Sequence, residues 1–208
     1  MKKYNNENGR KNMRLQGYDY SRAGMYFLTI VVQKRLHLFG HIENGQMILN
    51  DAGQMIEKWY REIENKYYDK RCHQMVVMPN HFHCIIENVE MDAHAHVSGA
   101  HVGTPLRGRP IVDGGRPIDD DGRPNPNKYG LHNKKNGATI GDVMDWFKTM
   151  TTNEYIRGVK NDNWQRFDGK LWQRNYYDNI IRNGPNFERI SNYINKNPEN
   201  WENDNFNK

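Results

Sequence analysis

The chain contains the stretch Met75-Val76-Val77-Met78-Pro79-Asn80-His81-Phe82-His83-Cys84-Ile85-Ile86-Glu87. The Pro-Asn pair is a turn signal between two apolar runs, and the second run has the aromatic and β-branched residues typical of a strand. Side chains two apart in a strand point to the same face, so His81 and His83 are predicted to present two imidazoles side by side. Neutral imidazole binds first-row divalent metals. The pair alone therefore permits a metal site. The alternative is that the two strand histidines have only a structural role.

The bulk properties predict a single domain with a basic surface. A length of 208 residues suits one domain, while a hydrophobic content of 36% and a mean hydropathy of −1.03 indicate that part of the chain lies outside the core. A net charge of +5 and a pI near 9.1 favour an anionic partner, although a solvated basic surface is an equal alternative.

The cysteines and the apolar runs indicate in which cellular compartment the protein is expected. Two cysteines, Cys72 and Cys84, exclude a disulfide framework, and a zinc site that joins them to the nearby histidines matches no structural zinc spacing. The chain shows no apolar signal segment and no run of membrane-spanning length, so we expect a cytoplasmic protein without a membrane partner.

The hydrophobic pattern predicts an α+β sandwich in which one antiparallel sheet has helices against a face. Strands are expected over 26–33, 75–78 and 81–87, with a short strand or hairpin arm near 45–49. Helices are expected over 51–65, capped by Asn50 or Asp51, over 140–157, capped by Thr139, and from about 185 to just before Pro198.

Residues 88–138 differ in composition from the rest of the single domain, 1–208. A Gly-Arg-Pro triplet recurs every seven residues, at 108–110, 115–117 and 122–124. This segment has little to bury, so we predict a flexible insertion of low complexity. Its arginines could contact phosphates, but a solvated loop is favoured.

The last predicted helix carries a second set of polar residues. Ile190, Tyr193, Ile194 and Asn197 recur at the spacing of one helical face, so the isoleucines would bring the tyrosine and the asparagine to the sheet. A tyrosine simply hydrogen-bonded to an asparagine is the plain structural alternative. Pro198 also biases Asn197 away from helical backbone angles.

Two further segments complete a recognisable order of motifs: Trp172-Gln173-Arg174-Asn175-Tyr176-Tyr177-Asp178 and Ile190-Ser191-Asn192-Tyr193-Ile194-Asn195-Lys196-Asn197-Pro198-Glu199-Asn200-Trp201. Together with the His-Phe-His stretch they resemble the REP-associated tyrosine transposases, a branch of the His-hydrophobe-His (HUH) endonuclease superfamily. Segments 18–20, 26–30 and 38–40 share the resemblance, which therefore covers nearly the whole chain outside the insertion.

The resemblance implies a ferredoxin-like palm that cuts and rejoins single-stranded DNA at hairpins. It implies that His81, His83 and Asn197 are metal ligands, that Tyr193 is the nucleophile, and that the metal is Mg²⁺ or Mn²⁺. Attack by a tyrosine on a DNA phosphate would give a 5′-phosphotyrosine and a free 3′-hydroxyl, so that no separate energy cofactor is needed.

Other residues of these motifs are assigned by their chemistry. Tyr176 and Tyr177 are rival nucleophiles, but their aromatic and basic setting suits packing and DNA contact better. Predicted phosphate contacts are Lys148, Arg157, Arg174 and Arg182, with Trp172 as a stacking platform for a base. Fold packing or a solvated face is an equal alternative for each of these five.

The expected function is a metal-dependent single-tyrosine DNA transposase or nickase. The alternative is a domesticated, non-catalytic protein that binds structured DNA or RNA, although a pure binder has no use for the two histidines, the tyrosine and the asparagine together. A structural metal-binding protein would need its metal in order to fold. A monomer is favoured over a swapped dimer, because the short segment 177–193 can return the tyrosine to its own histidine pair.

Overall fold

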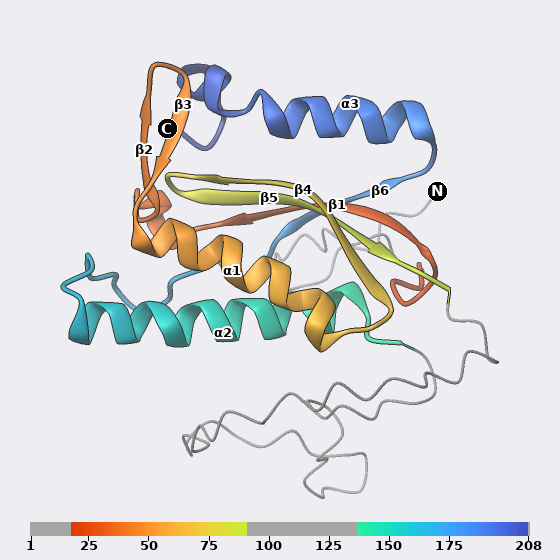
Figure 1. Cartoon of the computed structure of the whole chain (residues 1–208), viewed down its shortest axis with the longest axis horizontal. Helices are drawn as coiled ribbons and strands as arrows, with labels where there is room; N and C mark the ends of the chain where they lie inside the picture. The colour runs from red at the N-terminus through yellow and green to blue at the C-terminus, as the bar shows by residue number, and fades with distance from the viewer. Residues whose placement is uncertain (1–17, 91–136, 208) are drawn as a thin grey trace, which may run out of the picture.

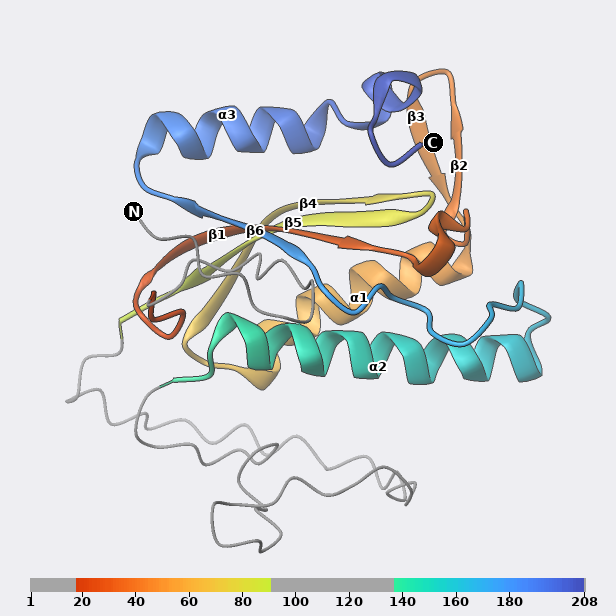
Figure 2. The same cartoon turned by 180° about the vertical axis from the view of Figure 1, so that it is seen from behind.

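The protein has helices on both faces of one antiparallel sheet (Figure 1). The computed structural model describes residues 18–90 and 137–207. Helices α1 (Asp51–Lys66) and α2 (Ile140–Asn161) cover one face, and α3 (Gly184–Asn195) covers the other, as the reverse view also shows (Figure 2). The predicted α+β class is confirmed. The predicted flexible insertion lies outside the described residues, apart from its two ends.

The main sheet has the strand order β4-β5-β1-β6. Its strands are β1 (Gly24–Val31), β4 (Lys70–Met78), β5 (His81–Asn88) and β6 (Tyr177–Ile181), and every neighbouring pair is antiparallel. With α1 between the first two of these strands and α2 between the last two, the order is that of a ferredoxin-like β-α-β-β-α-β unit. Within the described residues, no helix is long and apolar enough to cross a membrane.

Strand β5 is buried on both faces. Its side chains alternate between the hydrophobic core on one face and the two histidines on the other. Its apolar side chains Phe82, Cys84 and Ile86 belong to the main hydrophobic core under α1 and α2. His81 and His83 point to the opposite face, towards α3, where their two Nε2 atoms lie 3.1 Å apart. The histidines thus share a face, as the strand period predicts.

Helix α3 is held over the histidine face by a small apolar cluster. Ile190 and Ile194 pack against Ile85 of β5 and Ile181 of β6, and all four are buried. The helix begins at the Asn183 side chain, which accepts a hydrogen bond from the Asn186 amide at 3.0 Å. A 3-10 segment, Pro198–Asn203, then leads to the C-terminal residues.

The predicted helices are confirmed, whereas two strands were missed. A hairpin of β2 (Gly40–Glu43) and β3 (Gln46–Leu49) includes the predicted arm, and its other strand was not predicted. Strand β6 was also missed, because Asp178 and Asn179 disfavour strands and only pairing with β1 stabilises this edge. Strand β4 begins five residues before the predicted start, at Lys70, where polar side chains conceal the pattern.

Replacement of Thr139 tests the start of α2. Its hydroxyl accepts a hydrogen bond from the Asp142 amide at 3.1 Å, and the Asp142 carboxylate accepts one from the Thr139 amide at 3.0 Å. Thr139→Ala is expected to lower the free energy of unfolding by about 1 kcal/mol, measured by urea denaturation. Thr139→Ser, which retains the hydroxyl, should stay near wild type. Equal stability of the two variants would contradict this role of the cap.

Candidate active site

The centre of the site is the histidine pair on β5. His81 and His83 are 0% and 1% exposed, and their Nε2 atoms face each other. On the far side of each ring, Nδ1 has a partner from the chain: Asn80 Oδ1 lies 2.9 Å from His81, and Thr29 Oγ1 lies 2.7 Å from His83. The Nε2 atoms are therefore the ones directed into the space under α3 and the C-terminal residues.

Both imidazoles are neutral at neutral pH. Burial lowers the pKa of His81 to about 4, against the opposing effect of the Asp204 carboxylate. Burial also lowers the pKa of His83 well below its ordinary value, and the neighbouring His81 adds to this shift. A neutral imidazole keeps one lone pair that can bind a metal ion, so neither ring needs a net loss of a proton.

Tyr193 on α3 reaches the histidine pair from above the sheet. Its Oη lies 3.4 Å from His83 Nε2, and its ring packs edge-on against Phe27 of β1 with 6.0 Å between ring centres. The residue is 45% exposed, so part of its side chain can meet a large substrate. Burial, followed by the Asp204 carboxylate, raises the pKa of Tyr193, while the Asn197 amide lowers it.

Asn197 lies beside both of these groups. Burial lowers the pKa of His81 and raises that of Tyr193, and the Asn197 side chain opposes both shifts, which places it near the two groups. It is 2% exposed, and its Oδ1 is buried without a hydrogen-bond partner among the described residues. Its φ of −60° and ψ of −42° are helical despite Pro198, although α3 itself ends two residues earlier, at Asn195.

The C-terminal residues contribute a group that was not predicted, Asp204. Its carboxylate lies 3.9 Å from His81 Nε2 with a side chain 5% exposed. Ligand atoms of His81, His83 and Asp204 all lie within 4.8 Å of one another. The segment also covers His81 with the rings of Trp201 and Phe206, whose centres lie 6.0 and 4.8 Å from the imidazole.

These donors suit a divalent cation. Two imidazole nitrogens and a carboxylate oxygen form a mixed set of the kind that Mn²⁺ accepts, and the amide and carboxylate oxygens are the ligands that Mg²⁺ prefers. The buried, unpartnered Oδ1 of Asn197 is a polar atom for which a cation would be a partner. The residues therefore fit the expected metal.

The rival tyrosines lie in different places. Tyr176 is 7% exposed and belongs to the core under α1 and α2, on the other side of the sheet from the histidines. Tyr177 pairs with Thr29 across β1 and β6, is 47% exposed, and contacts Phe206 with 5.8 Å between ring centres. Tyr177 is thus the rival on the histidine side of the sheet, whereas Tyr193 has the direct approach to His83.

Two of the predicted DNA contacts are engaged in the fold. Trp172 is 4% exposed and donates a hydrogen bond to Thr151 Oγ1 at 2.9 Å, so its indole cannot stack on a base without leaving the core. The Lys148 ammonium donates to the backbone carbonyls of Gln173 and Arg174 at 3.0 and 3.1 Å, so it holds the segment before β6. The structural alternative therefore accounts for both residues.

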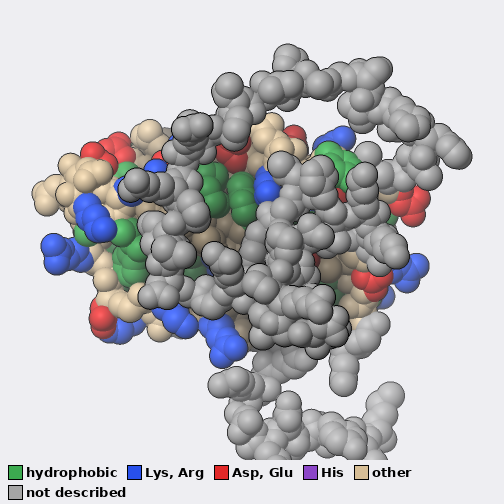
Figure 3. All heavy atoms as spheres, turned by 90° about the horizontal axis from the view of Figure 1, so that it is seen from below, with side chains coloured by type: hydrophobic (Ala, Val, Ile, Leu, Met, Phe, Trp, Pro, Cys, Tyr) green, Lys and Arg blue, Asp and Glu red, His purple; other side chains and the backbone are tan. Residues whose placement is uncertain are grey.

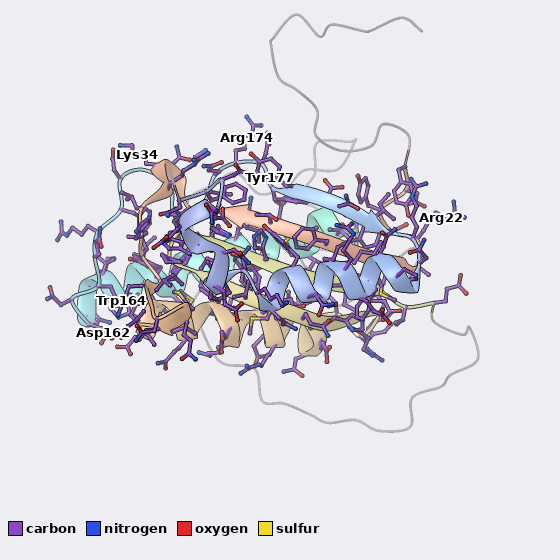
Figure 4. All side chains as sticks on the ribbon, turned by 90° about the horizontal axis from the view of Figure 1, so that it is seen from above. Arg22, Lys34, Asp162, Trp164, Arg174 and Tyr177 are labelled. Carbon is purple, nitrogen blue, oxygen red and sulfur yellow. The ribbon has the colours of Figure 1, made fainter. Side chains whose placement is uncertain are left out.

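The other three predicted contacts are exposed. Arg157 lies on α2 and pairs with Glu154 at 3.5 Å, and Arg182 follows β6. Arg174 extends away from the edge of the molecule near Tyr177 (Figure 4), and it lines a groove of about 470 Å³ together with Lys148. On the α1–α2 side, the visible Lys and Arg side chains are interspersed with acidic ones rather than gathered in one patch (Figure 3).

The neutrality of buried His81 makes stability depend on pH. Its pKa falls from the ordinary 6.5 to about 4 in the folded chain. Below about pH 6.5 the unfolded chain binds a proton that the folded chain does not, so the free energy of unfolding falls as the pH falls. Between about pH 7.5 and about pH 5 in EDTA, wild type should lose about 2 kcal/mol more than His81→Gln. Equal losses in urea denaturation would show that His81 is not held neutral.

Comparison with known proteins gives one relative in sequence and several in structure. No model of a known protein family matches the chain. A REP-associated tyrosine transposase bound to a REP hairpin aligns with a TM-score of 0.47 and 16% identity, over 89% of this chain and 73% of that one. A candidate transposase from Deinococcus radiodurans aligns with a TM-score of 0.41 and 14% identity, over 88% and 95%.

The relative in sequence is an uncharacterised protein of Haemophilus influenzae. The two chains are 34% identical over 198 residues, which cover 94% of this chain and 91% of the relative. A similarity of this extent takes in most of the sheet and the helices. The chain belongs to the same protein family as this Haemophilus influenzae protein.

Proposed function

We propose that the protein is a transposase-like, metal-dependent enzyme that cuts and rejoins single-stranded DNA through Tyr193. The observation that carries the proposal is the 3.4 Å approach of Tyr193 Oη to His83 Nε2, from a helix more than a hundred residues further along the chain. A tyrosine that only filled space would be expected to bury its hydroxyl or to bond to the backbone. Here the hydroxyl is directed at a buried pair of neutral imidazoles, and the residue that carries it is nearly half exposed.

The metal would be held by His81 and His83 through Nε2, with Asn197 and Asp204 offering oxygen ligands. When bound, a divalent ion polarises the scissile phosphate and stabilises charge on the leaving oxygen. Mg²⁺ and Mn²⁺ are the proposed ions, since the oxygen ligands favour the first and the mixed set suits the second. The aromatic rings of Trp201 and Phe206 exclude water from one side of the imidazoles.

The proposed reaction is a reversible exchange of one phosphoester for another. Tyr193 Oη attacks the phosphorus, the bond from phosphorus to the 3′ oxygen breaks, and the 5′ phosphate remains on the tyrosine. The phenolic proton passes to solvent, because the residue is nearly half exposed, and the leaving 3′ oxygen takes up a proton. Attack by another 3′-hydroxyl on the phosphotyrosine reverses these steps and rejoins DNA.

The proposed substrate is a single strand that forms a hairpin, as the resemblance of the motifs implies. Arg174 and Arg182 flank β6, the edge strand that begins at Tyr177, and both are exposed. We assign them to the phosphate backbone, which would bind them without reading sequence. Since Tyr193 approaches His83 of its own chain, one protomer holds all the proposed catalytic groups, which supports a monomer.

A covalent DNA adduct is the direct expectation of this function. Wild type, incubated with Mn²⁺ and a labelled hairpin-containing single strand, should form a complex that survives SDS. Tyr193→Phe should reduce this adduct to background, because the attacking oxygen is lost while the ring remains. Tyr177→Phe is the matched control on the same side of the sheet and should retain most of the adduct.

The two tyrosine variants separate the possible outcomes. An adduct that persists in Tyr193→Phe and disappears in Tyr177→Phe would transfer the nucleophile to Tyr177. No adduct in wild type, with hairpin binding intact, would favour the non-catalytic binder. Both variants remove only a hydroxyl at an exposed residue, so their stabilities should remain near wild type.

The oxygen ligands can be told apart by metal affinity. Asp204→Asn keeps the shape of the side chain but removes its charge, and Asn197→Ala removes the amide. Each variant should weaken Mn²⁺ binding about tenfold or more. The affinity is measured by electron paramagnetic resonance of free Mn²⁺. Glu202→Gln removes an exposed charge from the same segment and should leave the affinity unchanged. Normal affinity in Asp204→Asn, with weakening in Asn197→Ala, would exclude the carboxylate as a ligand.

A further inference from the structure

Asn80 holds His81 through an amide whose orientation is fixed. The side chain is fully buried, and its Nδ2 donates to two backbone carbonyls: Phe206 O at 2.7 Å and Arg35 O at 3.3 Å. Rotating the amide by 180° would set its oxygen against both carbonyl oxygens and leave its nitrogen facing the imidazole. Both amide hydrogens are thus committed, and Oδ1 must be the atom that faces His81 Nδ1.

This orientation decides which nitrogen of His81 carries the proton. Asn80 Oδ1 can only accept, so His81 Nδ1 must donate across the 2.9 Å contact. A neutral imidazole has one N–H, so His81 Nε2 keeps its lone pair. The turn is also held by its backbone, because the Asn80 carbonyl accepts a hydrogen bond from the Val32 amide at 2.8 Å. His81 is therefore prepared as a ligand before any metal arrives.

His83 is held differently. Its Nε2 lies 3.1 Å from His81 Nε2, and because that atom keeps its lone pair, the contact is favourable only if His83 carries its proton on Nε2. Its Nδ1 then accepts, and the Thr29 hydroxyl donates across 2.7 Å. Unlike an amide held by two carbonyls, a hydroxyl can rotate and act as donor or acceptor.

The next step rests on the proposed metal-binding role of the histidine pair. We propose that Asn80 is a positioning residue that fixes His81 in its Nδ1-protonated form. Thr29 is a reversible partner that lets His83 change tautomer when a divalent metal binds. His83 Nε2 releases its proton to solvent, and His83 Nδ1 takes up a proton from solvent. The Thr29 hydroxyl rotates so that its oxygen accepts a hydrogen bond from the new Nδ1–H. No proton is gained or lost overall. Both Nε2 lone pairs would then be available to hold a divalent metal.

The tautomers can be read directly by nuclear magnetic resonance of the full chain with ¹⁵N-labelled histidine. In the metal-free protein, long-range proton–nitrogen correlations should show His81 protonated on Nδ1 and His83 protonated on Nε2. Addition of Zn²⁺, a diamagnetic probe, should leave His81 in the same form and convert His83 to the Nδ1-protonated form. A purely structural role for Asn80 and Thr29 would not produce this unequal pattern.

Matched variants test the two partners separately. Thr29→Val removes the hydroxyl at nearly constant shape and should weaken Mn²⁺ binding about tenfold, whereas Thr29→Ser should restore it. Asn80→Leu should leave His81 as a mixture of tautomers and weaken Mn²⁺ binding by a similar factor. If Asn80→Leu does not fold, the wild-type spectra and the Thr29 pair still decide the matter.

Several results would overturn the proposal. These are His81 protonated on Nε2 in the metal-free wild type, His83 already protonated on Nδ1 without metal, or equal Mn²⁺ affinity in Thr29→Val and Thr29→Ser. Failure of the proposed function looks different, because the binding and the spectra need no DNA. A chain that shows the predicted tautomers and binds Mn²⁺, yet forms no DNA adduct, would keep the roles of Asn80 and Thr29 and lose the transposase activity.

Discussion

The register between β1 and β5 is the constraint on which the rest of the structure depends. It sets Thr29 opposite His83 and Val31 opposite His81, so that one strand supplies a partner for an imidazole of the other. Because side chains alternate, a slip of one residue would turn both histidines into the core under α1 and α2 and turn Phe82 out of it. The apolar packing of Phe82, Cys84 and Ile86 thus fixes the face on which the histidines lie.

The site is assembled from parts that are distant in the chain but share this face. The strand gives two imidazoles, α3 gives a tyrosine, and the end of the chain gives an amide and a carboxylate. The imidazoles are desolvated and neutral, so neither His81 nor His83 offers a positive charge to the Asp204 carboxylate. An anion, two neutral nitrogen ligands and an unpartnered amide oxygen are an arrangement that a cation would stabilise.

Much of this could be predicted from local sequence. The strand parity of His81 and His83, the cap of α2 at Thr139 and the helical spacing of Tyr193 all depend on neighbouring residues. Asp204 could not be found in this way, because its approach to His81 depends on how the chain turns after Pro198. Nor could β6, whose Asp178 and Asn179 become strand residues only through pairing with β1. The burial of Trp172 could not be predicted either. An aromatic residue among basic ones indicates DNA contact, but Trp172 is buried in the core.

A crystal of the full chain grown with Mn²⁺ would provide the most decisive single measurement. Anomalous scattering would locate the ion without assumptions about its ligands. The predicted peak lies between the Nε2 atoms of His81 and His83 on the α3 side of the sheet, with Tyr193 Oη directed to the same space. A peak at another group, or bound Mn²⁺ that is not coordinated by both Nε2 atoms, would contradict a shared metal and tyrosine site.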